Sequence, residues 1–273
     1  MSMSAHEPLV VPSWRQQDLA AICRRAQVLA FDLDTTLARS KTRMTPAMAV
    51  QFAAMTHLRP VAIISGGRFE QFRDQVLAAL PADTDMSQLH LMPTSGTRYY
   101  RWDGSQFQQV YAHDLSLADR QAAMASLERR ARQLGAWEEQ TWGPRLEDRG
   151  SQITFSALGQ QAPVDAKEAW DPGNEKKNAL AAAVARDLPH LQVRSGGSTS
   201  VDISAQGIDK AYAVRQLAQI LQRPVDSMVF VGDRMDPDGN DYPAAQAGTM
   251  ALRVSEPDDT LELLRTMEPL LRG

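Results

Sequence analysis

Two carboxylates at the end of an apolar run are the first residues in this chain that could do chemistry. The segment Val28–Asp34 begins with apolar residues and ends in Asp32 and Asp34, two positions apart. At the end of a buried strand, such a pair can supply a nucleophile or metal ligand and, beside it, an acid or base. The same pattern also caps helices and forms turns, so on its own it leaves both interpretations open.

Two further groups could bind an anion. Ser65-Gly66-Gly67 ends the apolar run Pro60–Ser65, and its small residues would let backbone N–H groups approach a phosphate. Lys210 begins a helix-like segment, and its ammonium is a compact charge suited to the same ligand. A plain turn and a solvated surface lysine are the alternatives.

An acidic loop, Gly232–Asp241, follows the apolar run Met228–Val231. Its carboxylates, Asp233 first among them, are hard oxygen ligands of the kind that suit Mg²⁺, which takes only one or two carboxylates and keeps several waters. A loop rich in Asp, Pro, Gly and Asn is otherwise ordinary turn composition.

The elements that must position these residues alternate between strand and helix. The patterns predict strands at 28–34, 60–65, 227–233 and 250–254, and helices at 46–55, 69–79, 210–221, 242–247 and 258–271. This rhythm is typical of an α/β protein with a doubly wound parallel sheet, which binds ligands at the carboxyl ends of its strands. A hairpin is expected within 91–110, where Asp103-Gly104 marks a turn.

A separate α+β module interrupts this rhythm. Helices are expected at 115–134 and 174–188, and strands at 152–158 and within 192–203. We therefore predict a catalytic core formed by residues 1–112 and 204–273, with an inserted α+β cap at 113–203.

Composition limits the classes of protein to which the chain can belong. Its 273 residues are 43% hydrophobic, and the net charge is −4, so no general electrostatic footprint for nucleic acid is present. Cys23 is the single cysteine and cannot form an internal disulfide. No apolar run reaches the ~20 residues of a membrane helix, and the N-terminal Met1–Trp14 lacks the pattern of a secretion signal. We predict a cytoplasmic protein with neither nucleic acid nor membrane as a partner.

Taken in order, the four groups resemble the motifs of the haloacid dehalogenase superfamily of phosphotransferases, which use DxDxT, a Ser or Thr, a Lys, and a GD…ND loop. The resemblance implies that Asp32 is the nucleophile that forms an aspartyl-phosphate and that Asp34 is the general acid/base. It also implies phosphate binding by Ser65, Gly66 and Lys210. The Mg²⁺ ligands would be Asp32, Asp34 through its backbone carbonyl, and Asp233.

Within the superfamily, the place of the insertion and several segments are similar to the eukaryotic-type phosphomannomutases. These segments include Phe69-Glu70, Arg149-Gly150, Gly196-Gly197 and Gly207–Lys210, and the likeness runs from about Val28 to Val254. It implies that Ser200 and Asp202 contact sugar hydroxyls, that the substrate is a small phosphorylated molecule, and that a homodimer through the cap is one option.

Three departures from the phosphomannomutase pattern bear on function. Ser151–Trp170 contains no arginine where that family grips a second phosphate, and its only cation is Lys167. Lysine does not replace the bidentate hold of a guanidinium. Ser65 stands where the mutases tend to have glycine and the phosphatases have Ser or Thr. Thr35 stands where glycine is usual, at a position whose backbone conformation a β-branched residue resists.

Three hypotheses follow. The first is a Mg²⁺-dependent phosphatase that hydrolyses a sugar or polyol phosphate through a phosphoenzyme on Asp32. The alternative is a phosphosugar mutase that interconverts mannose 6-phosphate and mannose 1-phosphate, which the missing arginines oppose. The third is a non-catalytic binding module, whose support is Thr35.

Overall fold

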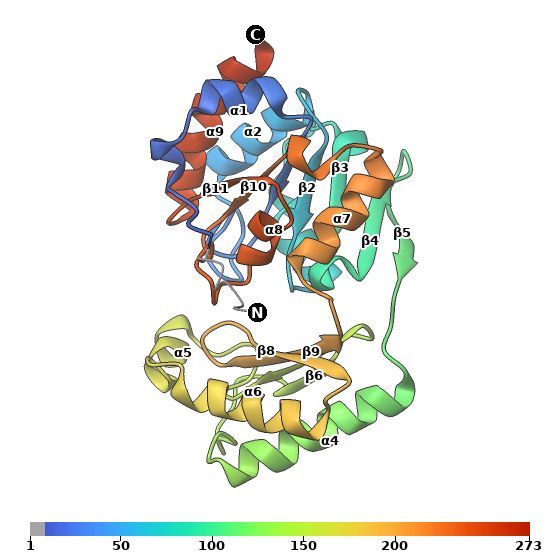
Figure 1. Ribbon diagram of the computed structural model, residues 1–273, viewed down its shortest axis with the longest axis vertical. Helices are drawn as coiled ribbons and strands as arrows, with labels where there is room; N and C mark the ends of the chain where they lie inside the picture. Colours follow the sequence, from blue (N-terminus) through green and yellow to red (C-terminus); the bar gives the residue numbers. More distant parts are fainter. Residues whose placement is uncertain (1–8) are drawn as a thin grey trace, which may run out of the picture. The chain divides into compact units, whose positions relative to one another are not determined.

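The computed structural model describes residues 9–273, which form two compact units (Figure 1). Unit 1 comprises the chain up to Tyr111 together with Asp209–Gly273, and unit 2 is Ala112–Ile208. The predicted start of the core at residue 1, and most of the segment tested for a secretion signal, lie outside the described residues. The second boundary falls later than the predicted 203/204 because strand β9 (Ser200–Ala205) continues past that point.

Unit 1 is built on a seven-stranded sheet with the order β11-β10-β1-β2-β3-β4-β5. Its strands are β1 (Val28–Phe31), β2 (Val61–Ile64), β3 (Leu89–Met92), β4 (Arg98–Trp102), β5 (Phe107–Ala112), β10 (Met228–Gly232) and β11 (Met250–Arg253). The pairs from β11 to β3 are parallel, and β4 runs antiparallel to β3. The four central strands β10, β1, β2 and β3 are fully buried, which explains why their sequences are almost entirely apolar, with His90 of β3 as a buried polar exception.

Helices cover both faces of this sheet. They are α1 (Leu19–Arg25), α2 (Pro46–Thr56), α3 (Phe69–Gln75), α7 (Lys210–Leu221), α8 (Tyr242–Gln246) and α9 (Pro257–Arg272). Figure 1 shows α1, α2 and α9 on one side of the sheet and α7 and α8 on the other. Along β1, Leu29 and Phe31 join the core beneath the first group, and Val28 and Ala30 join the core beneath the second. The predicted α/β fold with a doubly wound sheet is thus confirmed.

Unit 2 is an α+β module with a core of its own. An antiparallel sheet has the order β6-β7-β9-β8, formed by β6 (Leu146–Asp148), β7 (Gln152–Ser156), β8 (Leu191–Ser195) and β9. Helices α4 (Leu117–Gln133) and α6 (Glu175–Asp187) pack on one face of that sheet, and α5 (Val164–Trp170) is a short additional helix. Ile153 and Phe155 of β7 enter this core, so the alternate residues Gln152, Thr154 and Ser156 point to the other face.

Within residues 9–273, no helix has both the length and the apolar character needed to cross a bilayer.

Candidate active site

The carboxyl ends of three neighbouring strands of unit 1 bring the sequence-predicted residues together. Strand β1 lies between β2 and β10, with Phe31 opposite Ile63 on one side and Val231 on the other. The residues that follow these strands are Asp32, Ser65 and Asp233. Because parallel strands end at the same edge of the sheet, this edge carries a hydroxyl and two carboxylates.

A buried ion-pair cluster forms the centre of the site. The Lys210 ammonium donates to Oδ1 of Asp32 at 2.5 Å and also to Oδ1 of Asp241. Asp32, Lys210 and Asp241 are 4%, 2% and 0% exposed, so the charges are held away from water. The sequence placed Asp32 and Lys210 here, whereas Asp241 was missed as a site residue although it ends the acidic loop.

Three carboxylates, those of Asp32, Asp233 and Asp241, lie around the Lys210 ammonium. Burial and the charges of these groups shift the pKa values within the cluster. Burial raises the pKa of the Asp32 carboxyl well above its usual range, against the opposing effect of Lys210. Burial and the neighbouring Asp241 carboxylate raise the pKa of Asp233 to about 6. Burial lowers the pKa of Lys210, but the carboxylates of Asp241 and Asp32 outweigh it and raise that pKa. A cluster with more carboxylates than ammonium groups favours a further cation.

The donor set fits a hard divalent metal. In the described part of the chain, Asp32, Asp233 and Asp241 each offer a carboxylate oxygen, and these oxygens lie within 4.8 Å of one another. Oxygen ligands alone suit Mg²⁺. Thr36, which is fully buried, donates its hydroxyl proton to Oδ1 of Asp233 at 3.3 Å and so orients that carboxylate.

The loop that carries Asp233 and Asp241 has glycine where no other residue would fit. A Cβ at Gly232 would lie 2.4 Å from Oδ2 of Asp241, and one at Gly239 would lie 2.0 Å from the Arg234 carbonyl oxygen. The Arg234 amide donates to Oδ2 of Asp241 at 3.0 Å. The loop therefore wraps tightly around the Asp241 carboxylate and fixes its direction toward Lys210.

The Asp34 carboxylate makes its hydrogen bonds to groups outside this cluster. Its Oδ1 accepts from the Lys41 amide at 2.7 Å, and its Oδ2 accepts from Nε2 of Gln71 at 2.8 Å. A third donor, Nε2 of Gln75, lies 3.3 Å from Oδ1. The carboxylate is thus not among the oxygens of the candidate metal site, and metal binding through the Asp34 backbone carbonyl stays a prediction.

Thr35 directly follows Asp34 in the chain. Its backbone adopts the unusual conformation that the sequence predicted for this position. Its φ is 67°, in the left-handed region that favours glycine. A hydrogen bond from the Thr35 amide to the Ala38 carbonyl, at 2.7 Å, holds the tight turn in place. The chain thus turns directly after Asp34.

Ser65 and the glycines after it form a compact turn beside Asp32. Ser65 is 4% exposed, and its Oγ accepts from the Gly67 amide at 3.2 Å. A Cβ added at Gly66 would meet no atom within 4 Å, so the space over this residue is open. These features suit an approaching phosphoryl group, and phosphate binding by Ser65 and Gly66 stays a prediction.

Ser200 and Asp202 belong to unit 2 and not to the unit 1 cluster. Both lie on β9, where Oδ1 of Asp202 accepts from the Thr154 hydroxyl at 2.6 Å. The strand register places Asp202 opposite Thr154 on one side and Arg194 on the other. Their predicted contact with sugar hydroxyls stays a prediction.

Two cations of unit 2, Lys167 and Arg149, lie in or next to Ser151–Trp170, and both already bind other groups of unit 2. Lys167 donates to the Gln160 carbonyl at 3.1 Å. Arg149 pairs with Glu147 at 2.7 Å, and both side chains are about one-tenth exposed. The Arg149 guanidinium is therefore committed to a neighbouring carboxylate on the same sheet.

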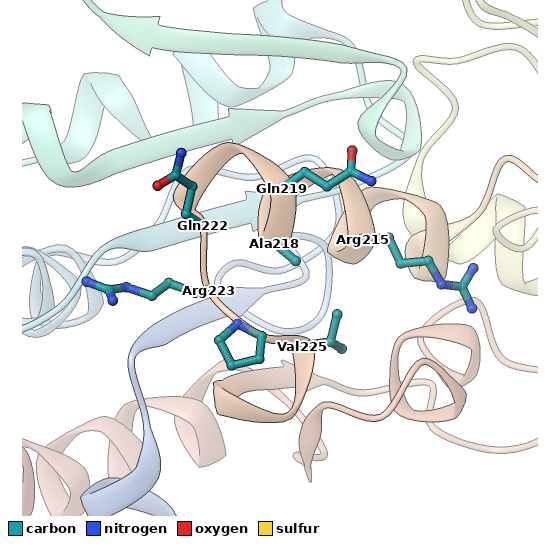
Figure 2. A pocket seen from close by; sticks show the side chains of 7 residues that line it. Arg215, Ala218, Gln219, Gln222, Arg223 and Val225 are labelled. Carbon is teal, nitrogen blue, oxygen red and sulfur yellow. The ribbon is translucent and has the colours of Figure 1, made fainter.

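A separate pocket lies at the opposite end of α7 from Lys210. It is lined by Arg215, Ala218, Gln219, Gln222, Arg223, Pro224 and Val225 (Figure 2). Since α7 has 12 residues, its ends are about 17 Å apart at 1.5 Å per residue. None of the predicted site residues lines this pocket, so it is distinct from the Asp32 cluster.

Comparison with known proteins gives a consistent relationship. The sequence model of the eukaryotic phosphomannomutase family matches residues 140–269. A phosphomannomutase of Oryza sativa subsp. indica is 24% identical over 266 residues, which cover 89% of this chain and 97% of that protein.

Two solved structures share the fold at low sequence identity. An IMP-bound Plasmodium falciparum IMP-nucleotidase superposes with a TM-score of 0.70 at 12% identity, covering 92% of this chain and 69% of that one. A trehalose-6-phosphate phosphatase of Aspergillus fumigatus gives a TM-score of 0.57 at 12% identity. The match covers 95% of this chain and 100% of that one. The sequence is thus similar to mutases, whereas the fold is shared with proteins named for phosphate hydrolysis.

Proposed function

We propose that this chain, which belongs to the haloacid dehalogenase superfamily and is similar to its eukaryotic phosphomannomutases, is a Mg²⁺-dependent phosphatase of small phosphorylated metabolites. The observation that carries the proposal is the buried Asp32 carboxylate, held 2.5 Å from the Lys210 ammonium within a cluster of two further carboxylates. A carboxylate in this place can be a nucleophile because its partner is a cation that also attracts a phosphoryl group.

In the first step, an Asp32 carboxylate oxygen attacks phosphorus and an O–P bond forms. The ester P–O bond breaks, and the leaving oxygen takes a proton from the Asp34 carboxyl. Lys210 and the Ser65–Gly67 turn bind the phosphoryl oxygens and so offset the repulsion between the two anions. When bound, Mg²⁺ would be held by Asp32, Asp233 and Asp241 and would neutralise further negative charge.

In the second step, water attacks phosphorus of the aspartyl-phosphate and gives a proton to the Asp34 carboxylate. The P–O bond to Asp32 breaks, and inorganic phosphate leaves. Asp34 thus regains the proton it gave up in the first step. For this cycle, the Asp34 carboxylate must face the reacting oxygen in both steps.

The substrate class follows from what unit 2 offers. Ser200 and Asp202 are hydroxyl and carboxylate groups suited to sugar or polyol hydroxyls. Ser151–Trp170 holds no arginine, and Arg149 is paired with Glu147. These features support a substrate with one phosphate at the Asp32 site and hydrolysis in place of return transfer to a sugar.

Phosphate release from a panel of phosphoesters, with and without Mg²⁺, tests the proposal. The panel should hold mannose 6-phosphate, trehalose 6-phosphate, IMP and p-nitrophenyl phosphate. We expect Mg²⁺-dependent release that Asp32→Asn abolishes and that Asp236→Asn, an exposed change in the metal loop, leaves intact. Full activity of Asp32→Asn would refute the role of Asp32. A complete absence of Mg²⁺-dependent turnover would favour the binding-module hypothesis.

A phosphosugar mutase is the second candidate, and the sequence similarity to phosphomannomutases favours it. Its signature would be conversion of mannose 6-phosphate to mannose 1-phosphate, activated by a sugar 1,6-bisphosphate and faster than phosphate release. That result would mean that unit 2 binds a second phosphate without arginines in Ser151–Trp170.

A further inference from the structure

Helix α3 presents two glutamine side chains to the predicted acid/base. Gln71 and Gln75 are four residues apart and therefore lie on one face of the helix. Gln71 donates to Oδ2 of Asp34 at 2.8 Å, and Gln75 approaches Oδ1 at 3.3 Å. Together with the Lys41 amide, they give both oxygens of Asp34 a hydrogen-bond donor.

The direction of the Gln75 amide is fixed by its surroundings. Nε2 faces three oxygen acceptors, the Thr42 carbonyl at 2.6 Å, Oδ1 of Asp34 and the Arg39 carbonyl at 3.5 Å. An amide turned over would place its oxygen against all three. In this orientation Gln75, which is 3% exposed, leaves its Oε1 buried with no partner among the described residues. A buried orphan oxygen is costly, so its presence indicates that the donor side of this amide is what the position requires.

Gln71 also contacts the phosphate-binding turn. A Cβ at Gly67 would lie only 2.3 Å from Oε1 of Gln71, so the amide packs directly on that glycine. The Gly67 amide in turn donates to Oγ of Ser65. One side chain thus spans the distance between the turn predicted to hold phosphate and the carboxylate predicted to move the proton.

We infer that Gln71 is a positioning residue that directs the Asp34 carboxylate relative to the phosphoryl group, with Gln75 as its support. This inference rests on the proposed function. Nε2 of the Gln71 amide donates to Asp34, and Oε1 of the same amide packs on Gly67. The Gln71 side chain therefore fixes the position of the Asp34 carboxylate relative to the Ser65–Gly67 turn. Without the amide, Asp34 keeps its other donors but loses this alignment with the Ser65–Gly67 turn.

The expected consequence depends on how basic the leaving group is. Proton transfer from Asp34 helps expel phenolate, a strong base, much more than p-nitrophenolate, which leaves readily without a proton. Because kcat/KM reports the steps through the first departure of the leaving group, misdirecting Asp34 lowers it for phenyl phosphate and spares it for p-nitrophenyl phosphate. The later attack by water needs Asp34 for both substrates, so kcat falls for both.

The test compares Gln71→Met, which keeps the length of the side chain but removes the donor, with Gln71→Leu, a second uncharged change that also removes the donor to Asp34. For each variant, we expect kcat/KM for phenyl phosphate to fall roughly tenfold or more. The same quantity for p-nitrophenyl phosphate should change less than about twofold. Gln219→Met, an exposed change on α7, is the matched control and should leave both substrates unaffected. Two variants are used so that a folding failure of one does not decide the result.

Equal losses of kcat/KM for the two substrates would overturn the inference, since they would assign Gln71 a purely structural role in the Ser65–Gly67 turn. Unchanged kinetics in both variants would overturn it as well. Failure of the proposed function itself looks different, because the unsubstituted protein would then release no phosphate in a Mg²⁺- and Asp32-dependent way.

Discussion

Thr35 occupies a backbone conformation that few non-glycine residues adopt, and it does so beside the predicted nucleophile. Its φ of 67° costs roughly 1–2 kcal/mol for a residue with a Cβ. Glycine would remove this strain. It would also make the unfolded chain more flexible, which lowers the free energy of unfolding by about 0.5–1 kcal/mol.

We therefore expect Thr35→Gly to raise the free energy of unfolding by up to about 1.5 kcal/mol and to leave phosphate release intact or increased. Urea denaturation and the phosphatase assay check the two parts. A clear loss of stability would mean that the threonine side chain contributes more than its backbone strain costs.

The carboxylates of Asp32, Asp233 and Asp241 lie within 4.8 Å of one another, so a bound divalent cation should stabilise the fold. At a Mg²⁺ concentration of about 100 times Kd, the gain is about 2.7 kcal/mol. We expect Mg²⁺ to raise the melting temperature and Asp233→Asn to abolish most of that rise. Asp236→Asn lies on the same loop with an exposed carboxylate and should respond to Mg²⁺ as the unsubstituted protein does. Equal responses of both variants would exclude Asp233 as a ligand.

At the scale of elements, strands β3 and β4 are joined by a buried polar pair. Nδ1 of His90 lies 2.7 Å from the Tyr99 hydroxyl, and His90 is 2% exposed. Burial lowers the pKa of His90 to about 4, with a smaller contribution from the positive charge of Arg101. In the unfolded chain, the imidazole titrates near its ordinary value of about 6.5.

Stability should therefore fall as the pH drops from about 6.5 to about 4, because the unfolded chain takes up a proton that folded His90 refuses. The loss approaches 1.4 kcal/mol per pH unit, or roughly 3 kcal/mol in total. Urea denaturation at pH 7 and pH 4.5 should show a smaller drop for His90→Gln than for the unsubstituted protein. His57→Gln, at an exposed position, should show an unchanged drop.

In unit 2, one aspartate ties α4 to α6. Asp187 accepts hydrogen bonds from Ser126 at 2.6 Å, Arg129 at 2.7 Å and Arg130 at 2.5 Å, and these donors lower its pKa. Asp187→Ala leaves the Ser126 hydroxyl and the nearby guanidinium groups without this acceptor. We expect a loss of about 1–3 kcal/mol in the unfolding of unit 2. A change below 0.5 kcal/mol would show that solvent replaces the carboxylate.

Local composition predicted most helices and strands. It did not predict the residues at which tertiary contacts end them. The helical pattern at 69–79 continues past Gln75, yet α3 ends there because the Gln75 carbonyl accepts from the Met44 amide at 2.9 Å. The chain then forms a short 3-10 turn, Leu77–Ala79. Strand β3 was not separated from the hairpin at 91–110, and the elements β6 and α5 were not predicted.

The same limit applies to the site. Asp32, Ser65, Lys210 and Asp233 could be predicted because each directly follows a strand or begins a helix. Asp241 lies eight positions after Asp233 and reaches the cluster only through the fold of the loop. Gln71 and Gln75 gave no signal, since a glutamine on a helix is ordinary surface composition until the Asp34 loop packs against it.

At the scale of the whole molecule, the chain leaves unit 1 after Tyr111 and returns at Asp209, one residue before Lys210. The sequence predicted an inserted cap at 113–203 from the change in the order of helices and strands, and the role of unit 2 as a cap stays a prediction. Unit 2 also carries half of the exposed large hydrophobic side chains among the described residues: Leu117, Leu134, Trp142 and Val164.

A homodimer formed through unit 2 is therefore a prediction for the intact chain. Light scattering should give twice the mass of one chain, and Leu117→Glu together with Val164→Glu should return the monomer. A monomeric mass for the unsubstituted protein at high concentration would contradict it, whereas a dimer unaffected by the double change would place the contact elsewhere.

The glycines of the metal loop have a consequence for how this protein can diversify. Every residue other than glycine collides at 232 and 239 with atoms of the same loop, so a lineage can explore almost no variants there without losing the fold of the loop. On the polar face of the unit 2 sheet, by contrast, Thr154, Asp202 and Arg194 lie in one row, and none of these positions is a glycine. New substrate preferences should therefore accumulate in the inserted unit, while the reaction chemistry is inherited unchanged.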